Sequence, residues 1–330
     1  MGEDAGVTNL DARPTEQDCP ADAAGAPVLE RYEARTVPLG GLRAAIVSRT
    51  LPHRALSTVG AWCFLDAFTP GQVPMNVLPH PHIGLQTVTW PLAGRMLHRD
   101  SLGSEQLLVP GELNIMTSGD GVAHSEFMVD DAGARGLQLW VALPDASRFV
   151  PRTFEHVADL PVREFPGARA TIFVGDYDGA ASRAAVHSPL LGLQIEVDAD
   201  ADVEIPLRPD FEHAVQMIDG AARIAGEDLP QGPLLYLGQG RDSLRVEHLS
   251  PGHDGVTRLL LLGGEPLRED LLMWWNFVGR THDEVAAARA DWEDRERRAE
   301  RFGVVPAHGE DRIPAPALPN VRLTARRRRR

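Results

Sequence analysis

The chain has 330 residues and a mass of 36.0 kDa, enough for two domains of ordinary size or one unusually large one. Hydrophobic residues make up 43% and charged residues 24%, which is typical of soluble globular proteins and excludes a wholly disordered or fibrous chain. All 33 basic residues are arginines and the formal net charge is -14, so we expect no direct nucleic-acid partner.

The first 28 residues are rich in Ala, Asp, Gly and Pro without periodicity, so we predict a disordered leader over residues 1–28. The leader lacks the apolar core of a signal peptide, and no apolar stretch approaches the roughly 18 residues of a membrane span. We therefore predict a cytoplasmic protein without a membrane partner. Cys19 and Cys63 are too few for a disulfide scaffold, and we expect reduced thiols, with Cys63 as a small buried hydrophobe.

Short apolar runs follow the leader, separated by Gly, Pro and Asp at intervals of about ten residues, as is typical of a β-sandwich or barrel. The clearest strands are predicted at residues 43–47, 85–92, 112–116 and 137–143. We assign residues 29–160 to a first barrel domain.

Two histidine-containing segments of this domain have the pattern of a metal site. In the segment PHPHIGLQ, the period-two alternation of a strand places His80, His82 and Gln86 on one face. In the segment GDGVAHSE, His124 and Glu126 are likewise two residues apart and share a face. If the two strands are neighbours, the three histidines and Glu126 converge on one point.

Three neutral imidazoles and one carboxylate suit Fe(II), Mn(II), Co(II), Ni(II), Cu(II) or Zn(II), and four protein ligands leave two positions of an octahedral ion open for substrates. The lack of thiolates argues against a structural zinc site. A lone His-x-His is more often a surface or core pair than a ligand pair, but a second His-x-Glu about 40 residues later makes the joint pattern specific. We therefore predict one divalent metal ion per chain, at a catalytic type of site.

Residues 161–303 form the second predicted domain, an approximate duplication of the first, with strands at 171–174, 191–197, 214–218, 234–237, 244–248 and 258–262. This half has no His-x-His. Glu212 and His213 are adjacent and face opposite sides of a strand, and His187, His248 and His253 show no paired spacing. We predict a metal-free barrel.

One helix is predicted near the end of the second domain, where Thr281 and Glu284 form a capping box. Val285, Ala288 and Trp292 follow at helical spacing, so the helix should pack its Ala and Trp face on a barrel. The aromatic residues just before it are expected to lie in a core or interface rather than in a substrate platform: Trp274, Trp275 and Phe277.

The end of the chain is Pro-rich and closes with five arginines at 326–330. We predict an extended tail over residues 304–330 with little packing. The arginine run could bind an acidic partner, but such runs are more often solvated.

In order and spacing, several motifs resemble those of the pirin family of bicupins. They are HPHIGLQTVTW from His80, HRDSLG from His98, PGE from Pro110, MTSGDG from Met116, HSE from His124, LQLWV from Leu137 and FVGRTHDE from Phe277. The resemblance covers residues 30–303 and implies an all-β fold of two cupin barrels packed face to face, with a C-terminal helix. It also implies one mononuclear metal ion, usually iron, in the N-terminal barrel, and His80, His82, His124 and Glu126 match the family's ligand positions.

The resemblance offers two classes of function. Bacterial pirins are associated with quercetin 2,3-dioxygenase activity, in which O₂ opens a flavonol with loss of carbon monoxide. Glu126 would then be both a ligand and the catalytic proton acceptor. Other pirins act with transcription factors or metabolic enzymes, which implies a redox-sensing regulatory or adaptor protein with a protein partner. We favour the enzyme because open coordination positions are chemically expensive to keep idle.

Four further expectations depend on the resemblance. Gln86 stands where pirins typically carry Glu, which either removes a negative charge beside the ion or leaves a residue that only hydrogen-bonds within the barrel. His98 lies either near the site or on a surface strand. The segment at 215–224 resembles a cupin hairpin and should pack against the first barrel and cover its mouth. Because a bicupin can bury its sheet faces within one chain, we expect a monomer.

Overall fold

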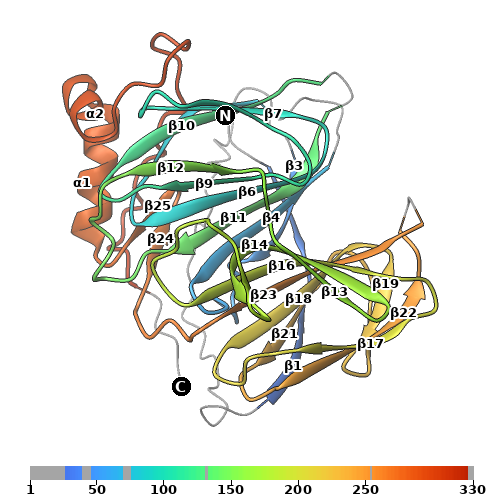
Figure 1. The fold of residues 1–330 in the computed structure, drawn as a ribbon. Coiled ribbons are helices and arrows are strands. Elements are labelled where there is room, and N and C mark those ends of the chain that lie inside the picture. Colours follow the sequence, from blue (N-terminus) through green and yellow to red (C-terminus); the bar gives the residue numbers. More distant parts are fainter. Residues whose placement is uncertain (1–26, 39–45, 70–75, 131–132, 253–254, 326–330) are drawn as a thin grey trace, which may run out of the picture.

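A computed structural model describes residues 27–38, 46–69, 76–130, 133–252 and 255–325 (Figure 1). Residues 1–26 of the predicted leader, Cys19, the start of the strand predicted at 43–47, His253 and the terminal arginines lie outside these residues. Strand β1 (Pro27–Tyr32) already occupies the last two residues of the predicted leader. The described chain consists mostly of antiparallel strands, and none of its helices has the length and hydropathy that a membrane span requires.

The first half forms a barrel from two sheets, with strand orders β12-β9-β6-β11-β4-β3-β2 and β5-β10-β7-β8. The strands predicted at 85–92, 112–116 and 137–143 correspond to β6, β9 and β11, to within two residues at each end. The bounds are β2 (Arg35–Pro38), β3 (Ile46–Leu51), β4 (Trp62–Phe68), β5 (Val77–His82), β6 (Leu85–Ala93), β7 (Met96–Asp100), β8 (Glu105–Leu108), β9 (Leu113–Thr117), β10 (Val122–Met128), β11 (Arg135–Ala142) and β12 (Thr153–Val157).

The second half repeats this arrangement, with strand orders β1-β21-β18-β23-β16-β14-β13 and β17-β22-β19-β20, and β15 beside β14. Each of the six strands predicted for this half lies within an observed strand. Strand β1 pairs with β21, so the first described strand belongs to the second barrel. The bounds are β13 (Val162–Phe165), β14 (Ala168–Tyr177), β15 (Ala180–Ala181), β16 (Leu190–Val197), β17 (Asp202–Pro206), β18 (Glu212–Asp219), β19 (Ala221–Ile224), β20 (Glu227–Leu229), β21 (Leu234–Gly238), β22 (Ser243–Ser250) and β23 (Thr257–Gly264).

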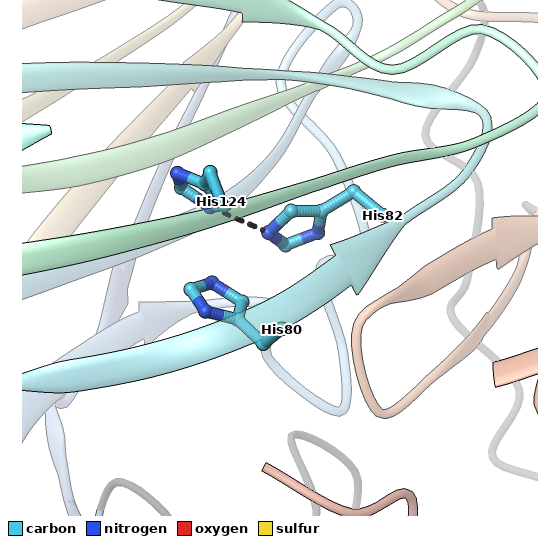
Figure 2. A group of neighbouring side chains, drawn as sticks. All are labelled: His80, His82 and His124. Carbon is cyan, nitrogen blue, oxygen red and sulfur yellow. Dashed lines mark hydrogen bonds between the residues drawn. The ribbon is translucent and has the colours of Figure 1, made fainter. Parts of the chain in front are cut away.

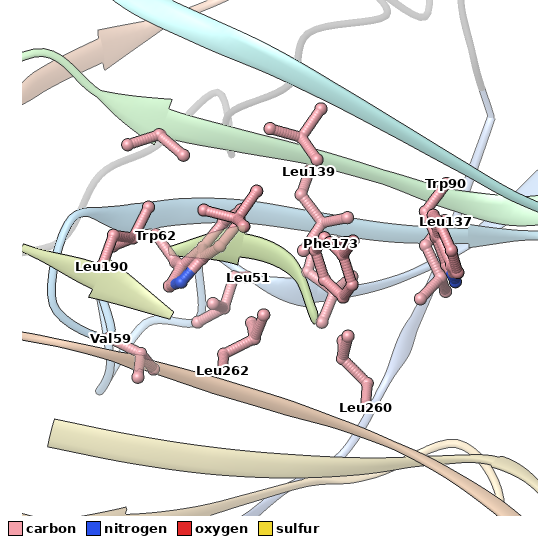
Figure 3. Close-up of a cluster of buried hydrophobic side chains, with 14 of the residues drawn as sticks. Leu51, Val59, Trp62, Trp90, Leu137, Leu139, Phe173, Leu190, Leu260 and Leu262 are labelled. Atoms are coloured by element: carbon pink, nitrogen blue, oxygen red, sulfur yellow. The ribbon is translucent and has the colours of Figure 1, made fainter. Parts of the chain in front are cut away.

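The two large sheets pack face to face, which confirms the predicted bicupin arrangement. The apolar cluster between them draws side chains from both halves, including Trp62 and Trp90 from the first and Phe173 from the second (Figure 3). Trp90 stacks on Phe173 with ring centroids 5.2 Å apart. The Trp62 indole nitrogen donates to the carbonyls of Leu191 at 3.0 Å and Gly263 at 3.2 Å. Because each fully buried aromatic contributes about 1.5–3 kcal/mol, this cluster holds the barrels together.

The predicted helix is present as α1 (His282–Glu293), and it is followed by a short second helix, α2 (Arg295–Arg301). Thr281 is the N-cap and accepts a hydrogen bond from the Glu284 amide at 3.2 Å. The buried face of α1 carries Val285, Ala288 and Trp292, as predicted, and packs against the first barrel and the hairpin β24 (Leu272–Trp274) and β25 (Phe277–Gly279).

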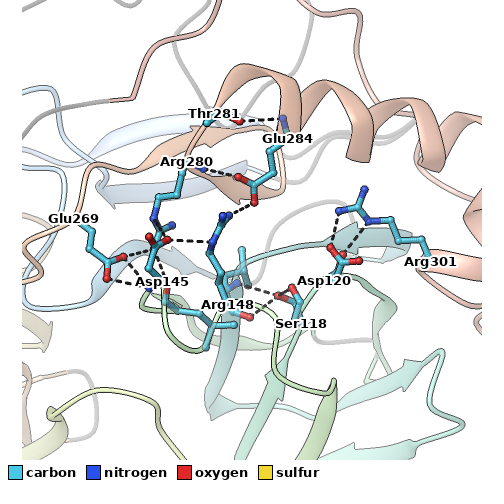
Figure 4. Close-up of polar contacts among 12 residues, drawn as sticks. Ser118, Asp120, Asp145, Arg148, Glu269, Arg280, Thr281, Glu284 and Arg301 are labelled. Carbon is cyan, nitrogen blue, oxygen red and sulfur yellow. Dashed lines mark hydrogen bonds and ion pairs between the residues drawn. The ribbon is translucent and has the colours of Figure 1, made fainter.

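Ion pairs tie this C-terminal region to loops of the first barrel (Figure 4). Arg148, in the loop after β11, pairs with Glu284 of α1. Arg280 pairs with Asp145 in the same loop at 3.2 Å, and Arg301 of α2 pairs with Asp120 at 2.9 Å. The helices are therefore fixed at the end of the barrel where β5 ends and β10 begins.

The prediction of an unpacked tail is wrong for residues 304–325. Val305 and Ala315 are buried in the cluster around α1, and the Trp292 indole donates to the Ile313 carbonyl at 2.8 Å. The Ile313 amide donates in turn to the Pro79 carbonyl of β5 at 2.9 Å. The prolines of this segment disfavour helix and strand. Its apolar residues nevertheless pack against α1.

The hairpin at 215–224 does not cover the mouth of the first barrel. It consists of β18, in the middle of the second barrel's large sheet, and β19, in its small sheet. Its apolar residues fill the second barrel and the cluster between the barrels. The expected packing role holds, but the first barrel's end is covered by β24, β25 and α1 instead.

Candidate metal centre

Strands β5 and β10 are hydrogen-bonded neighbours, which the site prediction requires. They run antiparallel with His124 directly opposite His80, and the register shifts by a bulge before Glu126. Residues two apart share a face of a strand, and directly opposite residues share a face of a sheet, so His80, His82 and His124 project to the same side.

The alternation predicted from residue 80 to 86 ends at Gly84. Its φ is +67°, and a Cβ there would lie 2.0 Å from the Val278 carbonyl oxygen, so this turn requires glycine. Strand β6 begins one residue later. The side-chain amide of Gln86 donates from Nε2 to the Thr117 hydroxyl and the Ala185 carbonyl, both at 2.9 Å. The prediction that Gln86 shares the histidines' face is therefore wrong: its side chain lies where the two barrels meet.

The imidazoles of His80, His82 and His124 form a cluster inside the first barrel (Figure 2). One ring nitrogen from each lies within 4.8 Å of the others, and the Nε2 atoms of His82 and His124 are 3.1 Å apart. The three side chains are buried, with 7%, 1% and 1% of their surface exposed. Two nitrogens each about 2.1 Å from a shared ion can lie at most about 4.2 Å apart, so the 3.1 Å pair is spaced as two ligands of one ion.

Hydrogen bonds select the ring nitrogens that face the cluster. His80 Nδ1 lies 2.9 Å from the Leu78 carbonyl, and His82 Nδ1 lies 3.0 Å from the Asn276 carbonyl. A carbonyl can only accept, so both Nδ1 atoms carry the hydrogen and both Nε2 atoms keep a lone pair. Partners of this kind orient metal-binding histidines.

Glu126 belongs to a second, overlapping group. Its carboxylate lies with ring nitrogens of His98 and His124 within 4.8 Å of one another, and it accepts a hydrogen bond from the Thr89 hydroxyl at 2.9 Å. Glu126 therefore lies near His124, beside the three-histidine cluster rather than at its centre. The complete four-ligand set stays a prediction.

Burial governs the protonation of these groups. It lowers the pKa of His80 to about 4, and it holds the pKa values of His82 and His124 well below the usual range, where repulsion among the imidazoles acts in the same direction. Burial also raises the pKa of Glu126, against the effects of His98 and the Thr89 hydroxyl. The three imidazoles are neutral at pH 7, as metal binding requires, and the carboxylate is a stronger base than an exposed one.

A row of polar side chains crosses the inner face of the large sheet opposite Glu126. Thr89 and Gln138 are directly paired residues whose side chains lie 3.1 Å apart, and Gln138 is opposite Asp66. Asp66 forms a buried, two-point ion pair with Arg49 at 2.6 and 2.7 Å. The barrel interior around the cluster is therefore polar on this side.

Sequence reasoning left the position of His98 open, and it missed two groups that contact these histidines: Asp100, beside His98, and the Asn276 carbonyl, beside His82. His98 is 3% exposed, and its Nε2 lies 3.1 Å from Asp100. The spacing of His98 and Asp100 by two residues was an available signal, since it places both on one face of a strand. The Asn276 carbonyl gave no such signal, because Asn276 lies 194 residues after His82 and contributes only a backbone atom.

Among the described residues, the histidines of the second barrel do not form a cluster. Glu212 faces the first barrel, where it accepts from the Gly60 amide at 2.8 Å, and His213 faces the opposite way. His248 contacts Thr257 at 3.0 Å. Within the described part of the chain, both groups of candidate ligands lie in the first barrel.

The donor set fits a divalent transition metal: three neutral imidazoles face one point, two of them have carbonyl partners that leave Nε2 free, and a buried carboxylate is adjacent. Cys63 lies apart from this set as a buried thiol whose pKa is raised to about 12 by burial. The arrangement can bind an ion and present it to a substrate inside the barrel.

Comparisons with known proteins agree with this geometry. The family model for Pirin matches residues 44–141, and that for the Pirin C-terminal cupin domain matches residues 192–298. A Pseudomonas aeruginosa protein named "Putative quercetin 2,3-dioxygenase" is 40% identical over 297 residues, covering 88% of this chain and 91% of that protein. A Caulobacter vibrioides "Pirin-like protein" is 34% identical, covering 79% and 92% of the two chains.

Among solved structures, the quercetin 2,3-dioxygenase of Acinetobacter baumannii superimposes with a TM-score of 0.82 at 39% identity, covering 90% of this chain and 97% of that one. Both halves of the chain, and the order of the two barrels, are thus shared with these relatives. The chain belongs to the pirin family of bicupin proteins.

Proposed function

We propose that this protein is a dioxygenase that opens a flavonol such as quercetin with O₂ and releases carbon monoxide, with one iron(II) ion held by His80, His82, His124 and Glu126. The observation that carries the proposal is the cluster of three neutral imidazoles beside a buried carboxylate. It is supported by the solved structure of a quercetin 2,3-dioxygenase at 39% identity and by a relative named "Putative quercetin 2,3-dioxygenase" at 40% identity. The same ligands accept Mn, Co, Ni, Cu and Zn, so the choice of iron is part of the proposal.

The bound ion would supply Lewis-acid and redox chemistry toward the flavonol hydroxyl and O₂. Glu126 accepts the proton that the flavonol hydroxyl loses, because burial raises the pKa of this carboxyl and makes it a better base. Thr89 holds the carboxylate through one oxygen. The covering hairpin β24–β25 and helix α1 shield this end of the barrel from water.

Metal analysis coupled to a turnover assay tests this proposal. The purified protein should contain about one iron per chain, and it should consume O₂ and release carbon monoxide when quercetin is added. The variant His80→Ala should lose both metal and turnover, whereas the matched control His187→Ala, from outside the cluster, should keep both. Turnover that persists without the metal would contradict the proposal.

Bound metal without turnover would instead favour the second function predicted from the sequence, a redox-sensing regulator or adaptor that binds a transcription factor or a metabolic enzyme. That function would require the partner to distinguish the native protein from His80→Ala. A cytoplasmic location, a monomeric state and the division at residues 160 and 303 stay predictions from the sequence.

A further inference from the structure

Asn114 presents a polar atom without a partner to the interior of the first barrel. It lies on β9 between Leu113 and Ile115, which belong to the apolar cluster between the barrels. Because side chains alternate along a strand, Asn114 points to the opposite side, into the first barrel. It is 3% exposed, and its Nδ2 atom has no hydrogen-bond partner among the described residues.

The other end of the Asn114 amide is held in place. Its Oδ1 atom lies 2.9 Å from Nδ1 of His156, the residue directly opposite on β12. In this orientation the atom left over is the amide nitrogen, which can only donate. Buried polar atoms of folded proteins are nearly always hydrogen-bonded, so an unpartnered donor inside the barrel points to a group that binds there and accepts.

Asn114 lies beside the carboxylate of the candidate metal centre. It is directly opposite Thr89 on β6, and the Thr89 hydroxyl donates to Glu126 at 2.9 Å. The Cβ atoms of directly opposite residues in an antiparallel pair are about 4.5–5.5 Å apart. A molecule that contacts Glu126 from inside the barrel is therefore within reach of Asn114.

Solvent reaches the barrel interior in the same row of polar side chains. Gln138 is paired with Thr89 on one side and with Asp66 on the other. Both neighbours are buried, yet Gln138 is partly exposed. Its side chain lies 3.1 Å from the Thr89 hydroxyl, on the inner face of the sheet, whose outer face is covered by the second barrel. The exposed part of Gln138 thus faces the interior, where a small molecule can meet this row.

The chemistry of a flavonol matches a donor at this position. The hydroxyl whose proton Glu126 would accept is bonded to a ring carbon, and the next ring carbon carries a ketone. A ketone oxygen only accepts hydrogen bonds, so it is the complement of an amide N–H. A flavonol whose hydroxyl contacts Glu126 can therefore direct its neighbouring ketone to Asn114 Nδ2.

We propose that Asn114 is a substrate-binding residue whose Nδ2 donates to the ketone oxygen of the flavonol. The proposal rests on the proposed function, and it adds a determinant of specificity that the metal ligands do not supply. A polyphenol with the hydroxyl but without the ketone leaves Nδ2 buried and unpaired, and a site with an unpaired polar group discriminates against such a ligand. The native protein should therefore bind quercetin more tightly than catechin, which carries the same hydroxyl groups but no ketone.

Binding of quercetin and catechin to the purified, metal-containing protein tests the proposal, with O₂ excluded so that no turnover occurs. Quenching of tryptophan fluorescence gives both affinities. Asn114→Leu should weaken quercetin binding about 3–10-fold, the effect of one neutral hydrogen bond, and should not weaken catechin binding. Asn320→Leu, the same change at an exposed position of the C-terminal segment, should leave both affinities unchanged.

Three results would overturn the proposal. They are equal quercetin affinity in native protein and Asn114→Leu, an equal loss for quercetin and catechin, and a native protein that binds catechin as tightly as quercetin. The last needs no variant, and Asn114→Ala replaces the leucine variant if that variant does not fold. Zinc competition with a chelator must give native affinity in the variant, which shows that the metal site is intact.

The same experiment separates this proposal from the proposed function. Quercetin binding with the expected dependence on Asn114, but without carbon monoxide release in air, would overturn the dioxygenase function alone. Turnover of quercetin by the native protein, together with equal quercetin affinity in Asn114→Leu, would overturn the role of Asn114 alone.

Discussion

Replacing His213 by leucine should make the protein less sensitive to acid. His213 lies on β18 with its side chain inside the second barrel, is 0% exposed, and has no hydrogen-bond partner at either ring nitrogen among the described residues. Burial lowers its pKa from 6.5 to about 4; Asp210 opposes this shift and Arg208 reinforces it. Leucine has a similar volume and cannot take up a proton.

The sign and size follow from proton linkage. Between pH 6.5 and 4 the unfolded chain binds a proton at His213 that the folded chain does not, so the free energy of unfolding falls as the pH falls through this window. At pH 5 this single group removes about 2 kcal/mol relative to pH 7.5. His80, His82 and His124 act in the same direction in both proteins, so their contributions cancel in the comparison.

Urea unfolding of the metal-free protein, followed by tryptophan fluorescence, measures the effect. The loss in unfolding free energy from pH 7.5 to pH 5 should be about 2 kcal/mol smaller in His213→Leu than in the native chain. Low protein concentrations are needed because the sequence pI is 5.3. Equal losses in the two proteins would refute the reasoning, because they would mean that His213 is protonated as easily in the folded chain as in the unfolded one.

Three further perturbations probe the barrel, the C-terminal segment and the site. Arg49→Met should lower the free energy of unfolding by about 3–5 kcal/mol, because it leaves Asp66 buried without its partner. Arg183→Met, from an exposed ion pair, should lower it by less than about 1 kcal/mol. Equal urea unfolding midpoints for the two variants would contradict this prediction. A chain that stops after residue 303 should melt at a lower temperature and bind zinc more weakly, because it loses the Ile313 amide that holds β5; unchanged zinc competition would argue against that link. Zinc at 100 times its Kd should stabilise the native protein by about 2.7 kcal/mol in thermal melts but leave His82→Ala unaffected, and equal shifts would place the ion elsewhere.

The strands and the histidine cluster could be predicted because their signals are local. Alternation locates β6, β16 and β23 within a residue or two, and His-x-His and His-x-Glu on neighbouring strands bring three imidazoles together. The capping box at Thr281 locates the start of α1 for the same reason.

The features that were missed depend on contacts between distant segments or on a local break in the pattern. Gln86 changes face because a turn at Gly84 interrupts the strand, and a period-two reading carries straight through that residue. The packing of residues 304–325 was missed because a Pro-rich segment without periodicity can still bury Val305 and Ala315. Asn276 contributes only its carbonyl, which every residue has.

The hydrogen bond between His82 and Asn276 has a consequence for protein synthesis. The ribosome makes all four predicted ligands long before it reaches Asn276, 194 residues after His82. A nascent chain, or a fragment limited to residues 44–141, therefore contains the ligands without the carbonyl that orients one of them. The orientation that this carbonyl gives to His82 can therefore form only after translation has passed Asn276.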